Sequence, residues 1–142
     1  MDIAMICDDD YVMPTCVALH SLIRHKDLHT DLHIHVITSN ISTTNQSRLN
    51  AFDSDDVHID IIARDADALF ANYHEFKEGA MCVASLAALF KFLLPDLLNE
   101  LDKVLYLDGD IIVRKALDEL YATDISDFYA AAVIDSGRTY FP

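Results

Sequence analysis

The chain has 142 residues, of which 52% are hydrophobic and only three are glycine and three proline. This composition indicates one globular domain with a buried core and excludes an intrinsically disordered chain. Twenty-four acidic residues against ten basic ones give a formal net charge of −14, and twenty of the acids are aspartate. A surface of this sign repels nucleic acid and anionic lipid, so a phosphate-bearing ligand would need a bound cation or a few placed donors.

The predicted elements alternate between strand and helix along the chain. Residues 3–7 form a short apolar run typical of a buried strand, and residues 12–25 have apolar side chains at helical spacing. Further strands are predicted at residues 32–38, 57–63, 104–107, 111–113 and 129–134. Further helices are predicted at residues 42–52, 65–73 and 82–94, the last ending near Pro95, with a helical turn at residues 117–121. This order predicts an α/β fold, a mostly parallel sheet with helices on both faces.

Asp-x-Asp occurs four times in the chain, and the pair Asp108 and Asp110 stands out by its surroundings. It interrupts the apolar run Leu105-Tyr-Leu-Asp-Gly-Asp-Ile-Ile-Val113, where charge is costly unless a metal or a phosphate requires it. A tight β-hairpin at Asp-Gly is the alternative interpretation. The two segments that flank the pair are apolar on both faces, which favours a buried strand that ends at Asp108 over a hairpin with one solvated face. Ligands bind at such strand ends in sheets of this class.

A second acidic cluster, at residues 8–10, follows the first predicted strand. It could line the same crevice as Asp108 and Asp110, because the carboxyl ends of parallel strands meet at one edge. The alternative is that these aspartates cap the following helix and occupy its first turn.

Cysteine and histidine give weaker signals. Cys7, Cys16 and Cys82 are dispersed in apolar surroundings and indicate buried thiols of a reducing compartment. We also expect no signal peptide and no membrane-spanning segment, so the predicted location is cytoplasmic. His33 and His35 share one face of a predicted strand with His29 nearby; a zinc site is conceivable, but a polar strand face is the favoured interpretation.

Four segments resemble glycosyltransferase family 8. They are the opening Met-Asp-Ile-Ala-Met-Ile-Cys-Asp-Asp-Asp-Tyr, the segment Cys-Val-Ala-Leu-His-Ser-Leu, the strand Leu-His-Ile-His-Val-Ile and the run Asp-Lys-Val-Leu-Tyr-Leu-Asp-Gly-Asp-Ile-Ile-Val. The resemblance covers all 142 residues in the family's order. It implies a GT-A fold and a retaining transferase that moves a hexose, galactose or glucose by default, from a UDP-sugar to a lipopolysaccharide or other surface-polysaccharide acceptor.

The resemblance also implies roles for individual residues. Asp108 and Asp110 would be ligands of Mn²⁺, or of Mg²⁺, bridging the donor diphosphate, with Gly109 beside the donor. Asp8 and Asp10 fall where the family contacts uracil and ribose, and Tyr11 where an aromatic ring packs on the base. Lys91 falls where the family usually has an arginine near the donor phosphates or sugar, and Leu89 where it has a tyrosine. Lysine keeps the charge but lacks the bidentate fork.

Family members continue for about as much chain again, and that part supplies a third metal ligand and the acceptor site. The resemblance therefore implies that residues 1–142 are a donor-binding half, with an incomplete sheet that could oligomerise and with any peripheral membrane contact elsewhere. No catalytic residue is assigned. Two alternatives stay open: a non-catalytic or truncated nucleotide-binding module, and a phosphatase of the haloacid dehalogenase type. The second is disfavoured because Ile111, not glycine, follows Asp110.

Overall fold

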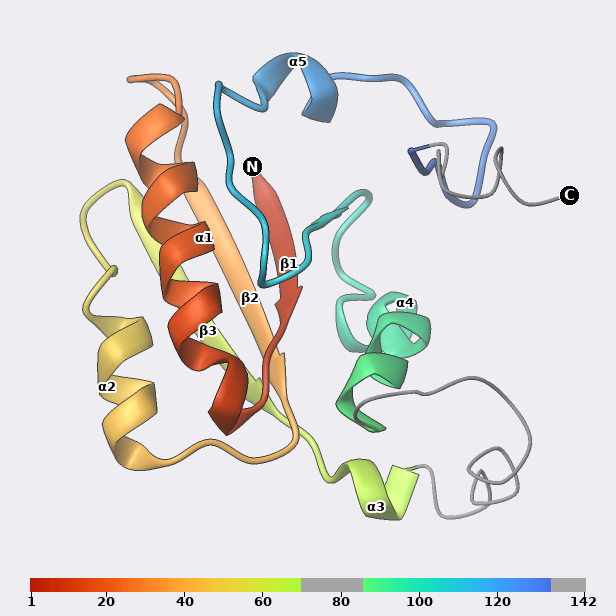
Figure 1. Ribbon diagram of the computed structural model, residues 1–142. Coiled ribbons are helices and arrows are strands. Elements are labelled where there is room, and N and C mark those ends of the chain that lie inside the picture. The colour runs from red at the N-terminus through yellow and green to blue at the C-terminus, as the bar shows by residue number, and fades with distance from the viewer. Residues whose placement is uncertain (70–85, 134–142) are drawn as a thin grey trace, which may run out of the picture.

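The computed structural model describes residues 1–69 and 86–133, and its framework is a parallel sheet (Figure 1). The strands are β1 (Asp2–Ile6), β2 (Leu32–Thr38), β3 (Val57–Ala63) and β4 (Leu105–Tyr106), in the order β3-β2-β1-β4. Each neighbouring pair is parallel. The predicted α/β class with a mostly parallel sheet is therefore confirmed.

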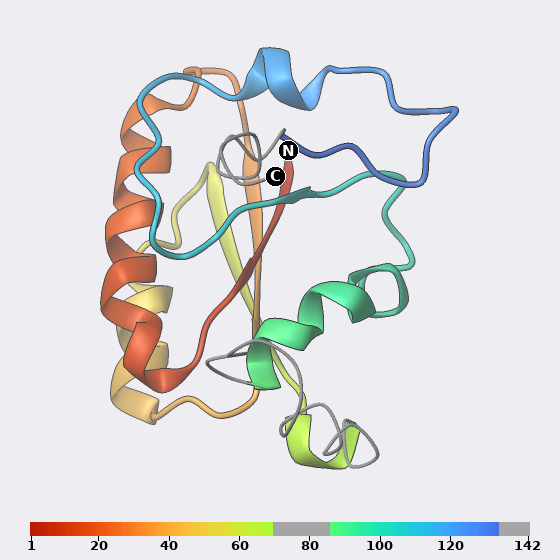
Figure 2. The same cartoon turned by 45° about the vertical axis from the view of Figure 1, so that its right-hand side comes forward.

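Helices cover both faces of the sheet, as predicted (Figures 1 and 2). On one face lie α1 (Val12–His25), which follows a 3₁₀ turn η1 (Asp9–Tyr11), and α2 (Thr43–Asn50). On the other lie η3 (Leu86–Leu93), a 3₁₀ helix, and its continuation α4 (Leu94–Leu97). Two single turns complete the helices of the described residues: α3 (Ala66–Leu69) and α5 (Asp118–Tyr121).

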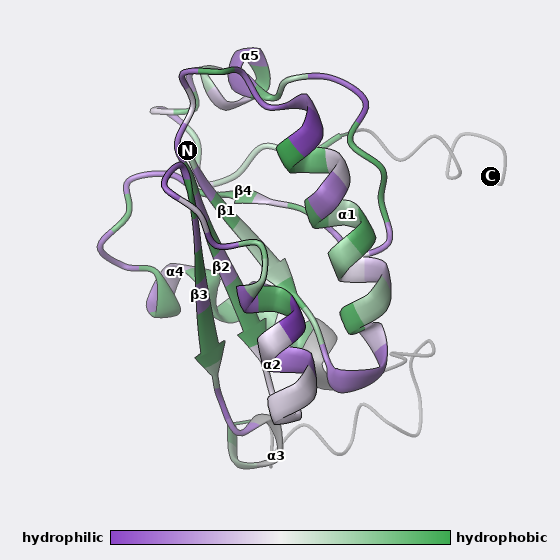
Figure 3. Cartoon of the chain, turned by 90° about the vertical axis from the view of Figure 1, so that its left-hand side faces the viewer, coloured by the Kyte–Doolittle hydropathy of each residue, from purple (hydrophilic) through white to green (hydrophobic). Residues whose placement is uncertain are grey.

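The alternation of the strands divides the core into two layers. Ile3 and Met5 of β1 point into the layer beneath α1 and α2, whereas Ala4 between them points into the layer beneath η3 and α4. Figure 3 shows the strands coloured mostly as hydrophobic. Phe90 of η3 is fully buried in the second layer. This two-sided burial explains why the parallel strands are short, apolar runs.

Two predicted strands are wrong. Residues 111–113 are not a strand and pair with none of the four strands of the described residues. Val113 is instead buried near α1, and its backbone N–H donates to Ser21 Oγ at 2.9 Å. Residues 129–133 are exposed and pair with no strand of residues 1–69 and 86–133, with Val133 92% exposed, and Ile134 lies outside the described residues. An apolar run forms a strand only where a neighbour satisfies its backbone.

Two predicted helices differ in extent. The prediction at 65–73 is met by α3, and residues beyond Leu69 lie outside the described part. The prediction at 82–94 is met from Leu86 onward, but η3 passes into α4 and Pro95 lies in the first turn of α4. Proline is tolerated there because the first-turn N–H has no partner within the helix. Pro95 therefore does not end the helical segment.

The structure also bears on the predicted thiols. Cys7 is buried and Cys16 is half-buried, both are free thiols, and Cys82 lies outside the described residues. Burial raises the pKa of the Cys7 thiol to about 11. Within residues 1–69 and 86–133, no helix is long and apolar enough to cross a bilayer.

Candidate functional site

The turn at residues 108–110 lies at the carboxyl end of β4, beside β1. Tyr106 pairs with Ala4 of β1, and the Leu107 N–H donates to the Ala4 carbonyl at 3.0 Å. The Asp108 and Asp110 side chains are exposed beyond this pairing. Residues 111–133 form no strand that returns beside β4, so the hairpin alternative is wrong and the predicted strand end is confirmed.

Gly109 fixes the turn against the first turns of α1. A Cβ atom at this position would lie 2.6 Å from Thr15 Oγ1, too close for any side chain without movement. Thr15 is fully buried, and its hydroxyl donates to the Tyr11 carbonyl at 2.8 Å. Glycine is required by this close approach of backbone to helix, which holds the Asp pair against the segment that contains Tyr11.

Each carboxylate of the pair accepts a hydrogen bond from a tyrosine. Tyr106 Oη donates to Asp108 Oδ1 at 2.7 Å, and Tyr11 Oη donates to Asp110 Oδ2 at 3.4 Å. Burial, followed by the bond to Asp108, raises the pKa of Tyr106. The Tyr106 phenol is thus a neutral hydrogen-bond donor over the whole physiological range. Sequence reasoning missed it, although its place two residues before Asp108 on a strand was a usable signal.

The acidic loop after β1 has a structural role at two of its three positions. Asp8 caps η1, its Oδ1 accepting from the Tyr11 N–H at 3.0 Å. Asp9 Oδ1 accepts from the Ser42 N–H and from Asn45 Nδ2, both at 2.8 Å. The Ser42 bond, and then the Asn45 bond, lower the pKa of Asp9.

The capping alternative therefore describes Asp8 correctly, while the predicted contacts of Asp8 and Asp10 with a nucleotide stay predictions. Asp10 is exposed, adjacent to Tyr11. The structural role of Asp9 was missed, because nothing in the sequence links it to residues more than thirty positions away.

Lys91 approaches the same place from the opposite face of the sheet. It is an exposed residue of η3, and its Nζ lies 6.0 Å from the centroid of the Tyr106 ring. Leu89, at the position of the family's tyrosine, is half-buried in the layer beneath η3 and α4. The predicted residues are thus joined in two short chains of contacts: Lys91–Tyr106–Asp108 and Asp8–Tyr11–Asp110.

The donor set suits a hard divalent cation but is incomplete. Asp108 and Asp110, two exposed carboxylates two positions apart, supply the oxygen ligands that Mg²⁺ and Mn²⁺ prefer. Within residues 1–69 and 86–133, no group of three or more His, Cys, Asp or Glu side chains could hold a metal ion. Asp108 and Asp110 therefore fit as part of a site whose remaining ligands would come from the nucleotide, water or other residues.

His33 and His35 lie on β2, between β1 and β3. His33 packs its ring against His58 at 4.9 Å between centroids. His35 is largely buried, with its Nε2 3.5 Å from Asp2 Oδ1 and its Nδ1 3.8 Å from Asp60 Oδ2. The favoured interpretation, a polar strand face, agrees with this arrangement.

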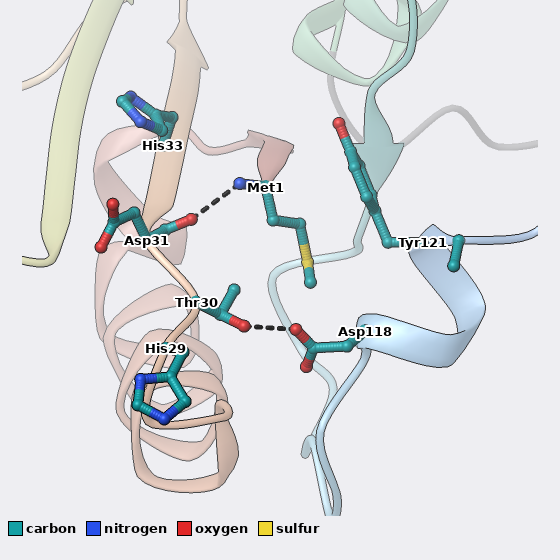
Figure 4. A pocket seen from close by; sticks show the side chains of 8 residues that line it. Met1, His29, Thr30, Asp31, His33, Asp118 and Tyr121 are labelled. Atoms are coloured by element: carbon teal, nitrogen blue, oxygen red, sulfur yellow. Dashed lines mark hydrogen bonds between the residues drawn. The ribbon is translucent and has the colours of Figure 1, made fainter.

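A shallow hollow of about 470 Å³ lies beside the N-terminus (Figure 4). The Met1 amino group donates to the Asp31 carbonyl at 2.7 Å, and the Thr30 hydroxyl donates to Asp118. None of the predicted site residues lines it. It lies at the amino ends of the strands, the edge opposite to the one where ligands bind in this fold class.

Comparison with known proteins agrees with this geometry. The model of the glycosyl transferase family 8 matches residues 2–142. The chain is 26% identical over 141 residues to general stress protein A of Bacillus subtilis, covering 97% of this chain and 47% of that protein. It is 47% identical over 58 residues to glycosyltransferase GlyA of Streptococcus pneumoniae, covering 40% of this chain and 8% of that protein.

Among solved structures, the chain is similar to the galactosyltransferase LgtC in complex with donor and acceptor sugar analogs. The TM-score is 0.74 at 28% identity, over 89% of this chain and 44% of LgtC. The chain thus spans less than half the length of these relatives. The expected GT-A fold is confirmed, and the chain belongs to glycosyl transferase family 8.

Proposed function

We propose that this chain is the donor-binding part of a metal-dependent, retaining hexosyltransferase that uses a UDP-sugar. The observation that carries the proposal is the pairing of β1 with β4, which brings the Asp108–Asp110 turn beside the loop that contains Tyr11. A nucleotide and a cation can then bind at one edge of the sheet, formed by two segments about a hundred residues apart in the sequence.

In the proposed complex, Asp108 and Asp110 would hold Mn²⁺ or Mg²⁺, with Gly109 beside the donor. The cation would supply Lewis acidity to offset the charge on the departing UDP. With a net charge of −14, the protein cannot attract a diphosphate by its general field, so a local cation is needed.

The loop after β1 would bind the nucleoside. Tyr11 is 46% exposed, which leaves its ring available to pack on a base. Asp10 is exposed and adjacent to it, so its carboxylate can accept from a ribose hydroxyl. Asp8 would contact uracil, with its Oδ1 already occupied by the Tyr11 N–H. Lys91 would supply a point charge to the donor phosphates or sugar.

The proposed acceptor is a saccharide of a lipopolysaccharide or other surface polysaccharide, and the proposed location is cytoplasmic. Similarity to LgtC, whose structure contains donor and acceptor sugar analogs, supports the first proposal. The free thiols Cys7 and Cys16 support the second, because disulfides are rare in the reducing cytosol.

Calorimetric titration with UDP, in Mn²⁺, in Mg²⁺ and with EDTA, tests the proposal, followed by transfer assays with a panel of UDP-hexoses. We expect binding that requires the metal, and its loss in Asp108→Asn/Asp110→Asn. The matched control is Asp53→Asn/Asp55→Asn, which removes the same charge from another exposed Asp-x-Asp pair. Equal binding with and without metal, or equal losses in both double variants, would contradict the proposed site. Metal-dependent binding without transfer would identify a nucleotide-binding module.

A further inference from the structure

We propose that Tyr106 is a positioning residue that orients the Asp108 carboxylate for the cation and keeps Lys91 beside it. The inference rests on the proposed function, because it concerns the same metal and nucleotide site. Tyr106 itself need not touch either ligand.

Tyr106 is held rigidly by its backbone pairing and by the packing of its ring. Tyr106 belongs to β4, its backbone is paired with Ala4, and its ring packs in the layer beneath η3 and α4. A tyrosine ring held in this way has few rotamers, so its hydroxyl has a defined position. That hydroxyl is 2.7 Å from Asp108 Oδ1, whereas the exposed Tyr11 hydroxyl lies 3.4 Å from Asp110. Asp108 is therefore the better-oriented ligand of the pair.

The bond from Tyr106 leaves one oxygen of the Asp108 carboxylate available. A carboxylate has two oxygens, and the Tyr106 hydroxyl occupies Oδ1 of Asp108. Oδ2 would then be available to a cation, and the bond would restrict the orientations that the carboxylate can adopt in an exposed turn.

Lys91 lies on the other side of this contact, near the Tyr106 ring. Its Nζ lies 6.0 Å from the centroid of the same ring, at the outer range of a cation–π interaction. Tyr106 thus lies next to both the Lys91 ammonium group, which can bind a phosphate, and the Asp108 carboxylate, which can bind a cation. Phenylalanine at position 106 would keep the ring and lose only the hydroxyl, whereas leucine would lose both contacts.

The chain contains a matched arrangement at the other end of the sheet. Lys103 Nζ lies 4.8 Å from the centroid of the Tyr121 ring, and the Tyr121 hydroxyl can donate to Asp2 Oδ2 at 3.3 Å or to the Lys103 carbonyl at 3.1 Å. Tyr121→Phe therefore removes a tyrosine hydroxyl that lies beside an aspartate and a lysine at the opposite end of the sheet from the proposed site. It controls for the general cost of losing such a bond.

The test is Mn²⁺ binding by electron paramagnetic resonance, with and without UDP, below the unfolding temperature of every variant. We expect Tyr106→Phe to weaken Mn²⁺ binding about 10-fold or more, the usual effect of removing a hydrogen bond to a ligating carboxylate. Tyr121→Phe should bind Mn²⁺ as the unmodified chain does. Tyr106→Leu should in addition weaken UDP binding measured at saturating Mn²⁺, as should Lys91→Ala.

The outcomes separate this inference from the proposed function. If the unmodified chain shows no metal-dependent UDP binding, the proposed function fails and the inference fails with it. If the unmodified chain binds both ligands and Tyr106→Phe binds Mn²⁺ equally well, the inference alone is overturned. An equal loss of Mn²⁺ affinity in Tyr121→Phe would also overturn it, because the effect would then be one of general stability.

Discussion

Replacing Gly109 by alanine tests whether the Asp pair is held in place by its contact with α1. The added Cβ would meet Thr15 Oγ1 at 2.6 Å, and the next nearest atoms are also of Thr15, its Cβ at 3.7 Å and its Cα at 3.8 Å. If Thr15 rotates, its bond to the Tyr11 carbonyl is lost, at about 1 kcal/mol. If the turn moves instead, overpacking costs about 1–3 kcal/mol.

We therefore expect Gly109→Ala to lower the free energy of unfolding by about 1–3 kcal/mol in urea titrations, and the unfolding temperature by about 3–10 °C. A double-mutant cycle identifies the cause. Thr15→Ala removes the atom at 2.6 Å and leaves ordinary contacts, so Gly109→Ala should cost little in that background. Thr15→Val keeps a γ atom in that place, so the cost should persist. Equal costs in both backgrounds would refute the reasoning.

Three further predictions concern stability. Asp9→Asn should destabilise the chain above about pH 4 and flatten its acid unfolding curve. The lowered pKa of Asp9 in the folded state stabilises the fold fully only above the unfolded-state pKa, and this stabilisation is lost as the pH falls through the folded-state pKa. Urea titrations between pH 3 and 7 measure the effect, and parallel curves for the variant and the unmodified chain would contradict it. Ser42→Ala should cost about 1 kcal/mol in the same assay, because Ser42 caps α2; no loss would show the cap to be unimportant. Phe90→Ala should lower the free energy of unfolding by about 3–5 kcal/mol, because Phe90 is fully buried. Phe92 is 72% exposed, so Phe92→Ala should lower it by about 0.5 kcal/mol or less, and similar losses in the two variants would place the core elsewhere.

The fold was predictable where each segment had both a clear pattern and a neighbour. Residues 32–38 and 57–63 alternate and are strands with the predicted bounds, because each pairs along its length. Residues 111–113 are equally apolar, but an apolar pattern indicates only that a segment is buried. It does not indicate whether a neighbouring strand is present to pair with the segment. Val113 is buried by α1, and the Ser21 hydroxyl replaces the missing strand.

The strand end that carries the candidate site was predictable from the sequence, whereas the contacts that support it were not. The apolar segments on both sides of Asp108 indicated a strand end, as found. The three aspartates after β1 could not be told apart, because what distinguishes Asp9 is the position of Ser42 and Asn45 at the start of α2. That contact depends on how α2 lies beside the loop, which no local pattern encodes.

The four Asp-x-Asp pairs, which are alike as tripeptides, differ in what their carboxylates accept. In three pairs the first aspartate accepts from a backbone N–H: Asp8 from Tyr11, Asp53 from Ile59 and Asp65 from Ala68. These are turns and caps, in which the carboxylate satisfies the chain itself. Asp108 and Asp110 accept instead from tyrosine hydroxyls of two different segments, β4 and the loop after β1.

A strand end alone does not make this difference. Asp8 and Asp65 also follow a strand by two positions, after β1 and β3, and the Cys7 and Arg64 N–H groups donate to β2 as the Leu107 N–H donates to β1. What distinguishes Asp108 and Asp110 is that tyrosine hydroxyls, and not backbone N–H groups, donate to their carboxylates. These two carboxylates are therefore not used to close a turn or to start a helix, which is the condition that the proposed cation site requires.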